Sequence, residues 1–176
     1  MKKTVKILLC TVLLAACTVL LFGCAGEDYV PDGYMLASGD VNDFDLYVPK
    51  SWTVSLSDGT VAAYYSAADP SSVSVMPGGL EHADTTVDDW WEGYVSDFEK
   101  VYKDFALLSE SDAEMGGENG RKYEYKGTLG DYTYRFELTA VIHEGNIYMF
   151  TYTSTEELFA NHTDEVGKMI GYFSFR

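Results

Sequence analysis

The clearest pattern along the chain is a series of apolar residues at helical spacing between Val87 and Phe105. They recur in steps of three and one, which places them on one face of an α-helix: Val87, Trp90, Trp91, Tyr94, Val95, Phe98, Val101, Tyr102 and Phe105. Thr86 and Asp89 have the spacing of a capping box at the start of such a helix. The pattern therefore predicts an amphipathic helix over residues 87–105.

Shorter apolar runs separated by turn residues precede this helix and predict β-strands. We expect strands over residues 34–37, 44–48, 52–56, 61–66 and 72–76. Pro49 ends the second of them, because proline lacks the N–H group that a ladder requires. Asp58-Gly59 lies between the third and the fourth, and this dipeptide favours the tight turn of a hairpin.

Residues 121–154 alternate between apolar and polar side chains and predict a three-stranded antiparallel meander. Turns at Gly130-Asp131 and Glu144-Gly145 determine its register. The second turn produces these pairs: Ile142 with Ile147, and Ala140 with Met149.

The first turn of the meander places like charges opposite each other. Glu124 faces Glu137 and Lys126 faces Arg135, an arrangement that destabilises a pair of strands. Their diagonal neighbours have the opposite sign, so we retain this register.

Both faces of the meander are apolar toward its middle strands, and such a sheet must be covered on both sides. Two helices are available to cover it, the one over residues 87–105 and a second one over residues 156–172. We therefore predict an α+β fold in which an antiparallel β-sheet is covered by helices on both faces.

The first 24 residues have the pattern of an export and anchoring signal. Three lysines within the first six residues precede an apolar run over residues 7–22, which is followed by Gly23-Cys24. A cysteine at this place resembles the lipobox of bacterial lipoproteins, and the resemblance implies cleavage before Cys24 and lipid attachment to it. Cys17 follows a similar box, Leu14-Ala15-Ala16, and is the alternative lipidation site. An uncleaved transmembrane helix is the other interpretation of this segment.

The prediction divides the chain into a signal peptide over residues 1–23, a tether over residues 24–33 and a domain over residues 34–176. No cysteine follows Cys24, which excludes a disulfide, a thiolate nucleophile and a cysteine-ligated metal from the domain. Removing the signal deletes three lysines and no acid, which changes the formal charge from −16 to −19. This charge argues against a nucleic-acid partner. We expect the domain outside the cytoplasm, attached to the cell membrane by its lipid.

Several segments of the domain resemble the PsbP family. They are the run from Phe44 to Trp52, which contains a strand-Pro-x-x-Trp corner, and the aromatic segments over residues 122–125, 150–153 and 173–175. The similarity extends from Gly33 to Phe175 and is greatest to the bacterial PsbP-like lipoproteins. It implies an α-β-α sandwich with an antiparallel sheet, and it provides no catalytic residues.

Candidate metal ligands gather near the start of the helix over residues 87–105. They are His82, Asp84, Asp88, Asp89 and Glu92. Hard oxygen ligands suit a divalent cation such as Ca²⁺, although acidic residues at a helix N-terminus also interact favourably with the helix dipole without a metal. His143 lies beside a hairpin turn and is expected to be solvated, whereas His162 falls on the face of the last helix. No histidine belongs to a zinc or nucleophile motif, so we expect neither a cofactor nor an enzyme.

Aromatic residues are abundant, with 14 Tyr, 9 Phe and 3 Trp. Five of them could either fill the core or stack on a small molecule: Trp90, Trp91, Tyr94, Tyr148 and Tyr152. Two functions are compatible with these features. The first is a non-catalytic binding or scaffold role in the cell envelope, with an envelope protein or small molecule as partner. The alternative is a lipoprotein that binds a small ligand or a divalent cation in an aromatic and acidic pocket.

Overall fold

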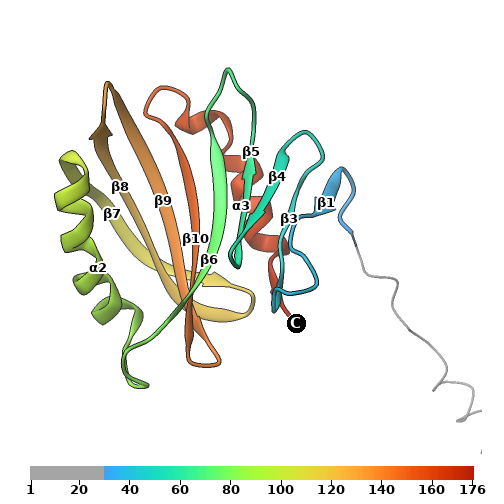
Figure 1. Cartoon of the computed structure of the whole chain (residues 1–176), viewed down its shortest axis with the longest axis horizontal. Coiled ribbons are helices and arrows are strands. Elements are labelled where there is room, and N and C mark those ends of the chain that lie inside the picture. Colours follow the sequence, from blue (N-terminus) through green and yellow to red (C-terminus); the bar gives the residue numbers. More distant parts are fainter. Residues whose placement is uncertain (1–29) are drawn as a thin grey trace, which may run out of the picture.

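A seven-stranded antiparallel β-sheet with the strand order β4-β5-β6-β10-β9-β8-β7 forms the centre of the structure (Figure 1). The computed structural model describes residues 30–176. The strands of this sheet are β4 (Thr53–Ser57), β5 (Thr60–Tyr64), β6 (Ser72–Gly79), β7 (Lys103–Met115), β8 (Glu118–Leu129), β9 (Tyr132–His143) and β10 (Asn146–Thr155). The pairing of β6 with β10 joins the early hairpin to the later strands and places two distant segments side by side.

The register predicted for the meander is confirmed. Ile142 pairs with Ile147 and Ala140 with Met149 between β9 and β10. Glu124 faces Glu137, and Lys126 faces Arg135, between β8 and β9. The diagonal contacts offset the like charges, because Arg135 pairs with Glu124 and the Lys122 ammonium lies 3.6 Å from Glu137.

Helix α2 (Val87–Val101) begins where the capping box predicts. The Asp89 backbone N–H donates to Thr86 Oγ1 over 3.1 Å, and the Thr86 backbone N–H donates to Asp89 Oδ2 over 3.0 Å. These two bonds satisfy N–H groups that have no partner inside the helix.

The predicted extension of this helix to Phe105 is wrong. The helix ends at Val101, Tyr102 is extended, and the backbone turns at Asp104, whose φ of 55° is in the left-handed region. Tyr102 packs over Gly127, where a Cβ atom would lie only 2.5 Å from the Tyr102 Cβ. Phe105 then contacts the same core from β7, so the helical spacing of apolar residues continues although the helix has ended.

Strand β7 has no counterpart in the sequence prediction, and the meander has four strands instead of three. It is an edge strand, and two irregularities in its pairing with β8 interrupt the alternation of side chains. Leu107 and Leu108 are both exposed, so neither period nor burial marks this segment as a strand.

The core consists of two layers, one on each face of the sheet. On one face, α2 packs over β7, β8 and β9, and its Trp91 lies between the helix and the sheet. On the other face, the sheet is covered by α3 (Thr163–Tyr172) and by the two short strands β1 (Tyr34–Leu36) and β3 (Tyr47–Pro49). Strand β2 (Phe44–Asp45) pairs with the final strand β11 (Ser174–Phe175) beside them.

The predicted fold class is therefore wrong. The protein is mostly β, and its sheet is not enclosed between helical layers on both faces. Only two α-helices occur in residues 30–176, and the short strands near the beginning of the domain bury Phe44, Leu46 and Val48 on the face that α3 leaves uncovered. A strand hairpin can cover a sheet face as well as a helix can, because burial depends on apolar area and not on the type of element.

The final helix is also shorter than predicted. Residues 156–158 form a turn, η2 (Phe159–Asn161) is a single turn of 3-10 helix, and α3 begins at Thr163. The backbone carbonyl of His162 accepts the first helical hydrogen bond, from the Val166 N–H over 2.9 Å. His162 is therefore the N-cap residue of α3 and not a residue on its face.

Candidate functional site

A cleft at the start of α2 is lined both by predicted metal ligands and by aromatic residues that were predicted to bind a small molecule. We call it the α2 cleft; it encloses about 490 Å³ between the end of β6 and the helix. Its lining residues are Gly79, Leu80, Glu81, His82, Thr85, Asp89, Trp90, Gly93 and Tyr94. The metal candidates His82 and Asp89 and the ligand candidates Trp90 and Tyr94 thus share one surface.

Two stacked aromatic rings form the wall of the α2 cleft on the helix side. The rings of Trp90 and Tyr94 are half-buried, with centroids 4.6 Å apart and planes 25° apart. Asp89 is already engaged, since hydrogen bonds from Thr86 occupy its Oδ2 atom and lower the pKa of its carboxyl group. The cleft therefore offers an aromatic surface with one further carboxylate, that of the exposed Glu81, at its lining.

The remaining metal candidates do not join this cleft. Asp88 accepts a hydrogen bond from the Tyr123 hydroxyl over 2.9 Å and lies 3.1 Å from the Arg121 guanidinium, on the other side of the helix start. Asp84 and Glu92 are exposed and do not line the α2 cleft. Among residues 30–176, no group of three or more His, Cys, Asp or Glu side chains is close enough to hold a metal ion.

The other three aromatic candidates lie in the core and on different faces of the sheet. Trp91 stacks on Tyr123 with ring centroids 4.0 Å apart and planes 8° apart. Tyr148 and Tyr152 point to the opposite face, where Tyr148 donates to Asp43 and Tyr152 donates to the Phe159 carbonyl over 2.8 Å. Burial and the Asp43 carboxylate raise the pKa of Tyr148 to about 12, so its hydroxyl keeps its proton at neutral pH.

A larger cleft lies at the opposite end of the sheet, beside the β8–β9 hairpin turn. We call it the hairpin cleft; it encloses about 870 Å³. Three segments line it: Ala67, Ala68 and Pro70 from the β5–β6 loop, residues 131–134 from the hairpin, and residues 155–158 after β10. Tyr132 is 62% exposed at its edge and Tyr134 is half-buried. This cleft was not predicted from the sequence, where the only signal for it is a tyrosine directly after the Gly130-Asp131 turn.

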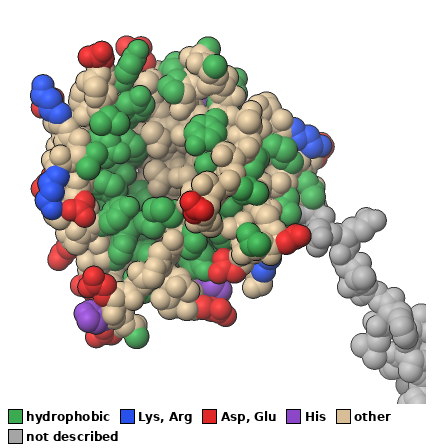
Figure 2. All heavy atoms as spheres, in the orientation of Figure 1, with side chains coloured by type: hydrophobic (Ala, Val, Ile, Leu, Met, Phe, Trp, Pro, Cys, Tyr) green, Lys and Arg blue, Asp and Glu red, His purple; other side chains and the backbone are tan. Residues whose placement is uncertain are grey.

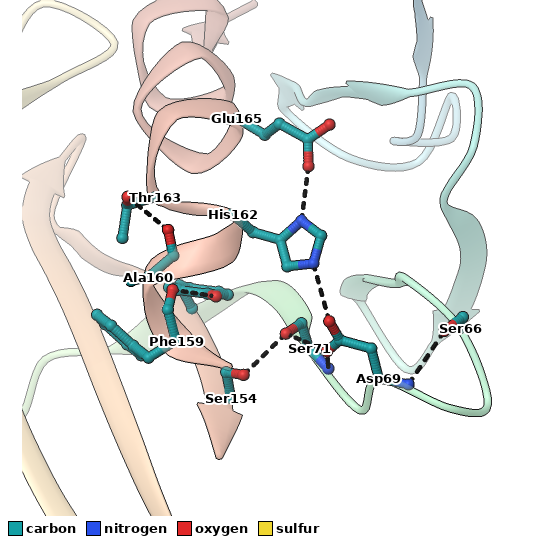
Figure 3. Close-up of polar contacts among 10 residues, drawn as sticks. Ser66, Asp69, Ser71, Ser154, Phe159, Ala160, His162, Thr163 and Glu165 are labelled. Atoms are coloured by element: carbon teal, nitrogen blue, oxygen red, sulfur yellow. Dashed lines mark hydrogen bonds and ion pairs between the residues drawn. The ribbon is translucent and has the colours of Figure 1, made fainter. Parts of the chain in front are cut away.

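A buried polar network holds two of these three segments together (Figure 3). His162 Nε2 lies 3.1 Å from Asp69 Oδ2, and His162 Nδ1 lies 2.8 Å from Glu165 Oε2. The Ser71 hydroxyl donates to Asp69 Oδ1 over 2.6 Å and is 2.8 Å from the Ser154 hydroxyl. We call this set the His162 network. It connects the β5–β6 loop to the end of β10 and to the start of α3.

The order of groups in the His162 network suits a structural role. Asp69 stands between the serine and the imidazole, so the imidazole cannot accept the Ser71 proton as a catalytic base does in a Ser-His-Asp arrangement. Burial by itself would raise the pKa of the Asp69 carboxyl, but hydrogen bonds from Ser71 and His162 outweigh this effect and hold the pKa below its usual value. Tyr65 and Trp52 enclose the imidazole, with ring centroids 4.1 Å and 5.4 Å away.

His143 is half-buried and not solvated as predicted. Its ring stacks on Phe175 with centroids 3.8 Å apart, and its Nδ1 atom is 2.8 Å from Glu118. The aromatic end of the chain folds back onto this hairpin, a contact between distant segments that local pattern does not predict.

Both lipidation candidates, Cys24 and Cys17, lie outside the described residues. Within residues 30–176, none of the helices is long and apolar enough to cross a membrane.

The fold is similar to that of several solved bacterial proteins, although the sequence matches no protein-family model and no curated protein. Cyanobacterial PsbP from Synechocystis sp. PCC 6803 aligns over 89% of this chain and 99% of its own, with a TM-score of 0.61 and 15% identity. PA94 from Pseudomonas aeruginosa, a protein of unknown function, aligns over 81% of this chain and 97% of its own, with a TM-score of 0.59 and 15% identity.

A third similar structure is that of LpqN, which is involved in cell envelope biogenesis of Mycobacterium tuberculosis. It aligns over 74% of this chain and 82% of its own, with a TM-score of 0.54 and 12% identity. These likenesses show that the chain has a PsbP-like fold, which confirms the resemblance seen in its sequence at the level of the fold.

Proposed function

We propose that this protein is an exported, lipid-anchored binding protein of the cell envelope, with Cys24 as its point of attachment. The basic start, the apolar run and the Gly23-Cys24 junction support the anchor, and Cys17 is the alternative site. Two acyl chains or more on one cysteine provide stable attachment where a single chain would be marginal. Residues 24–33 serve as a tether, and the acidic domain from residue 34 onward extends away from the membrane.

The domain acts by binding and not by catalysis. The observation that carries this proposal is the presence of a cleft lined by aromatic rings at each end of the sheet. Clefts of several hundred Å³ with a few polar groups are typical of ligand sites. The involvement of LpqN, which has a similar fold, in envelope biogenesis supports an envelope role for this chain as well.

The anchor is tested by growing cells with an alkyne-labelled palmitate analogue. We expect the wild-type chain to incorporate the label, Cys24→Ala to lose it, and the matched control Cys17→Ala to retain it. Loss in Cys17→Ala alone would move the anchor to Cys17. A wild-type chain that stays in the membrane fraction without taking up the label would contradict lipid anchoring. It would indicate that an uncleaved membrane helix anchors the protein instead.

The binding role is tested with the full chain immobilised and exposed to solubilised envelope components. Binding of a partner or ligand should raise the Tm of the chain, because any ligand that prefers the native state stabilises it. Measurable turnover of an envelope substrate, abolished by Asp69→Asn or His162→Ala, would contradict a purely binding role.

A further inference from the structure

The sheet face on the side of α2 is covered over only half of its width. α2 packs mainly against β7, β8 and β9, and the core beneath it also buries Ile147 and Met149 in the first half of β10. The second half of β10, together with β6, β5 and β4, stays open on this side (Figure 1). Figure 2 shows this side of the molecule: hydrophobic side chains form a band near α2, mainly uncharged atoms line the middle, and Asp and Glu lie mostly around the rim.

Hydroxyl side chains line the open half. Alternate residues of each strand point to this face, because Val73, Val75 and Tyr152 are buried on the other one. The residues that face outward include Thr53 and Ser55 of β4, Ser72 and Ser74 of β6, and Thr151 and Thr153 of β10; we call them the hydroxyl face. None of these six hydroxyl groups has a hydrogen-bond partner among residues 30–176. They are free to bond to a ligand.

The hydroxyl face is electrically neutral in a protein that is otherwise strongly charged. The whole chain carries 28 acidic and 12 basic residues, yet β4, β5, β6 and β10 contain none of either kind. A charged ligand would find no opposite charge on the hydroxyl face to compensate for the loss of its hydration. Acidic residues line only the clefts at its ends, among them Asp131, Glu156 and Glu157 in the hairpin cleft. The surface therefore suits a ligand that is polar but uncharged.

Strand β10 runs the whole distance between the two clefts. Its first residue, Asn146, pairs with Gly79 of the α2 cleft, and its last residue, Thr155, lines the hairpin cleft. A strand of this length spans about 33 Å. The hydroxyl face thus lies between the α2 cleft, with Trp90 and Tyr94, and the hairpin cleft, with Tyr132 and Tyr134.

We propose that the hydroxyl face and the two clefts at its ends, which we together call the groove, bind a linear, uncharged oligosaccharide or polysaccharide. Aromatic rings at the ends pack against the apolar faces of sugar rings, and the free hydroxyl groups between them exchange hydrogen bonds with sugar hydroxyls. This inference deepens the proposed binding function and rests on it. An extended peptide that adds to a sheet would bind along the free edge of β4 and not across this face, because β6 and β10 are both already paired.

The proposal is tested by calorimetric titration of the full chain in detergent micelles. The uncharged probes are cellohexaose, maltohexaose and hexa-N-acetylchitohexaose, and the charged comparison is hexagalacturonate. We expect at least one uncharged hexamer to bind, its monomer to bind far more weakly, and hexagalacturonate not to bind. Binding by none of the three uncharged hexamers, or a preference for hexagalacturonate, would overturn the proposal.

Two variants place the ligand in the groove. Ser74→Arg introduces a charge and a bulky side chain at its centre and should abolish binding, whereas Ser111→Arg on the exposed part of β7 should not. Tyr132→Ala should weaken binding about tenfold, as expected for truncation of an aromatic contact with the ligand, and Leu129→Ala in the same hairpin should have little effect.

If Ser74→Arg does not fold, Tyr132→Ala still tests the binding site. A side chain that is 62% exposed can be truncated without loss of the core. Unchanged affinity in Tyr132→Ala would refute the groove as the binding site. Stronger binding of an uncharged Gly-Ser-Thr repeat peptide would refute a saccharide as its ligand. The anchor experiment on Cys24 is independent of these titrations, so failure of one proposal is distinguishable from failure of the other.

Discussion

The Nε2 atom of His162 lies 3.1 Å from the Oδ2 atom of Asp69, a contact between residues 93 positions apart in the chain. It joins the N-cap of α3 to the loop between β5 and β6 (Figure 3). Because that loop and the segment after β10 both line the hairpin cleft, the contact helps to determine the shape of the cleft. Four predictions follow from this contact and from the packing around the sheet.

Replacing His162 with alanine should destabilise the protein by about 1–3 kcal/mol, because two buried or half-buried carboxylates lose their hydrogen-bond partner. Urea unfolding of the variant measures this loss. His82→Ala is the matched control, since His82 is exposed and should cost little. Equal effects of the two substitutions would show that the His162 network contributes nothing to stability.

The stability of the wild type should depend on pH through Asp69. Its pKa is lower in the folded state than the ordinary value of about 3.9, so its stabilising contribution is complete above that value. The contribution is lost as the pH falls through the ordinary value toward the folded one. The free energy of unfolding should therefore fall more steeply below about pH 4 in the wild type than in Asp69→Asn. Parallel pH profiles would contradict this role for the carboxyl group.

Truncation of Trp91 should be much more damaging than truncation of its neighbour Trp90. Trp91 is buried against Tyr123, and its loss leaves a cavity, so Trp91→Ala should cost about 3–5 kcal/mol. Trp90 is half-buried at the α2 cleft, and Trp90→Ala should cost clearly less. Chemical denaturation of both variants gives the comparison, and similar losses would mean that Trp90 belongs to the core.

A methyl group should be harmful at Gly120 and helpful at Gly93. A Cβ atom at Gly120 would lie 2.0 Å from the Ala140 carbonyl oxygen, which belongs to the paired strand and cannot move aside, so Gly120→Ala should cost about 1–3 kcal/mol. Gly93 lies inside α2 with open space around it, so Gly93→Ala should stabilise by about 1 kcal/mol. Thermal unfolding distinguishes the two, and a stable Gly120→Ala would contradict the close approach of β8 to β9.

The sequence predicted those elements in which residues close together in the chain set the geometry. The capping box at Thr86 and Asp89 marked the start of α2, and the Glu144-Gly145 turn determined the pairing of Ile142 with Ile147. The same local patterns failed at the end of α2. Phe105 continues the helical spacing from a strand, and nothing within a few residues of it shows that Tyr102 must lie over Gly127.

Local pattern also did not determine where the aromatic candidate residues lie. The sequence identified Trp90, Trp91 and Tyr94 as one aromatic group, but the helix turns Trp91 into the core and leaves the other two at a cleft. Tyr148 and Tyr152 were grouped with them on residue type alone, and the sheet separates them, because both point to its opposite face.

The sequence by itself determined the periods of the helix and of the central strands, the register of the hairpins and the acidic charge, because each depends on neighbours in the chain. Only the tertiary structure decided which strands lie at the centre, what covers each face, and that His162 meets Asp69. These outcomes follow from the strand order β4-β5-β6-β10-β9-β8-β7. The pairing of β6 with β10 aligns two uncharged segments about 70 residues apart, and this long-range contact creates the neutral open face of the sheet.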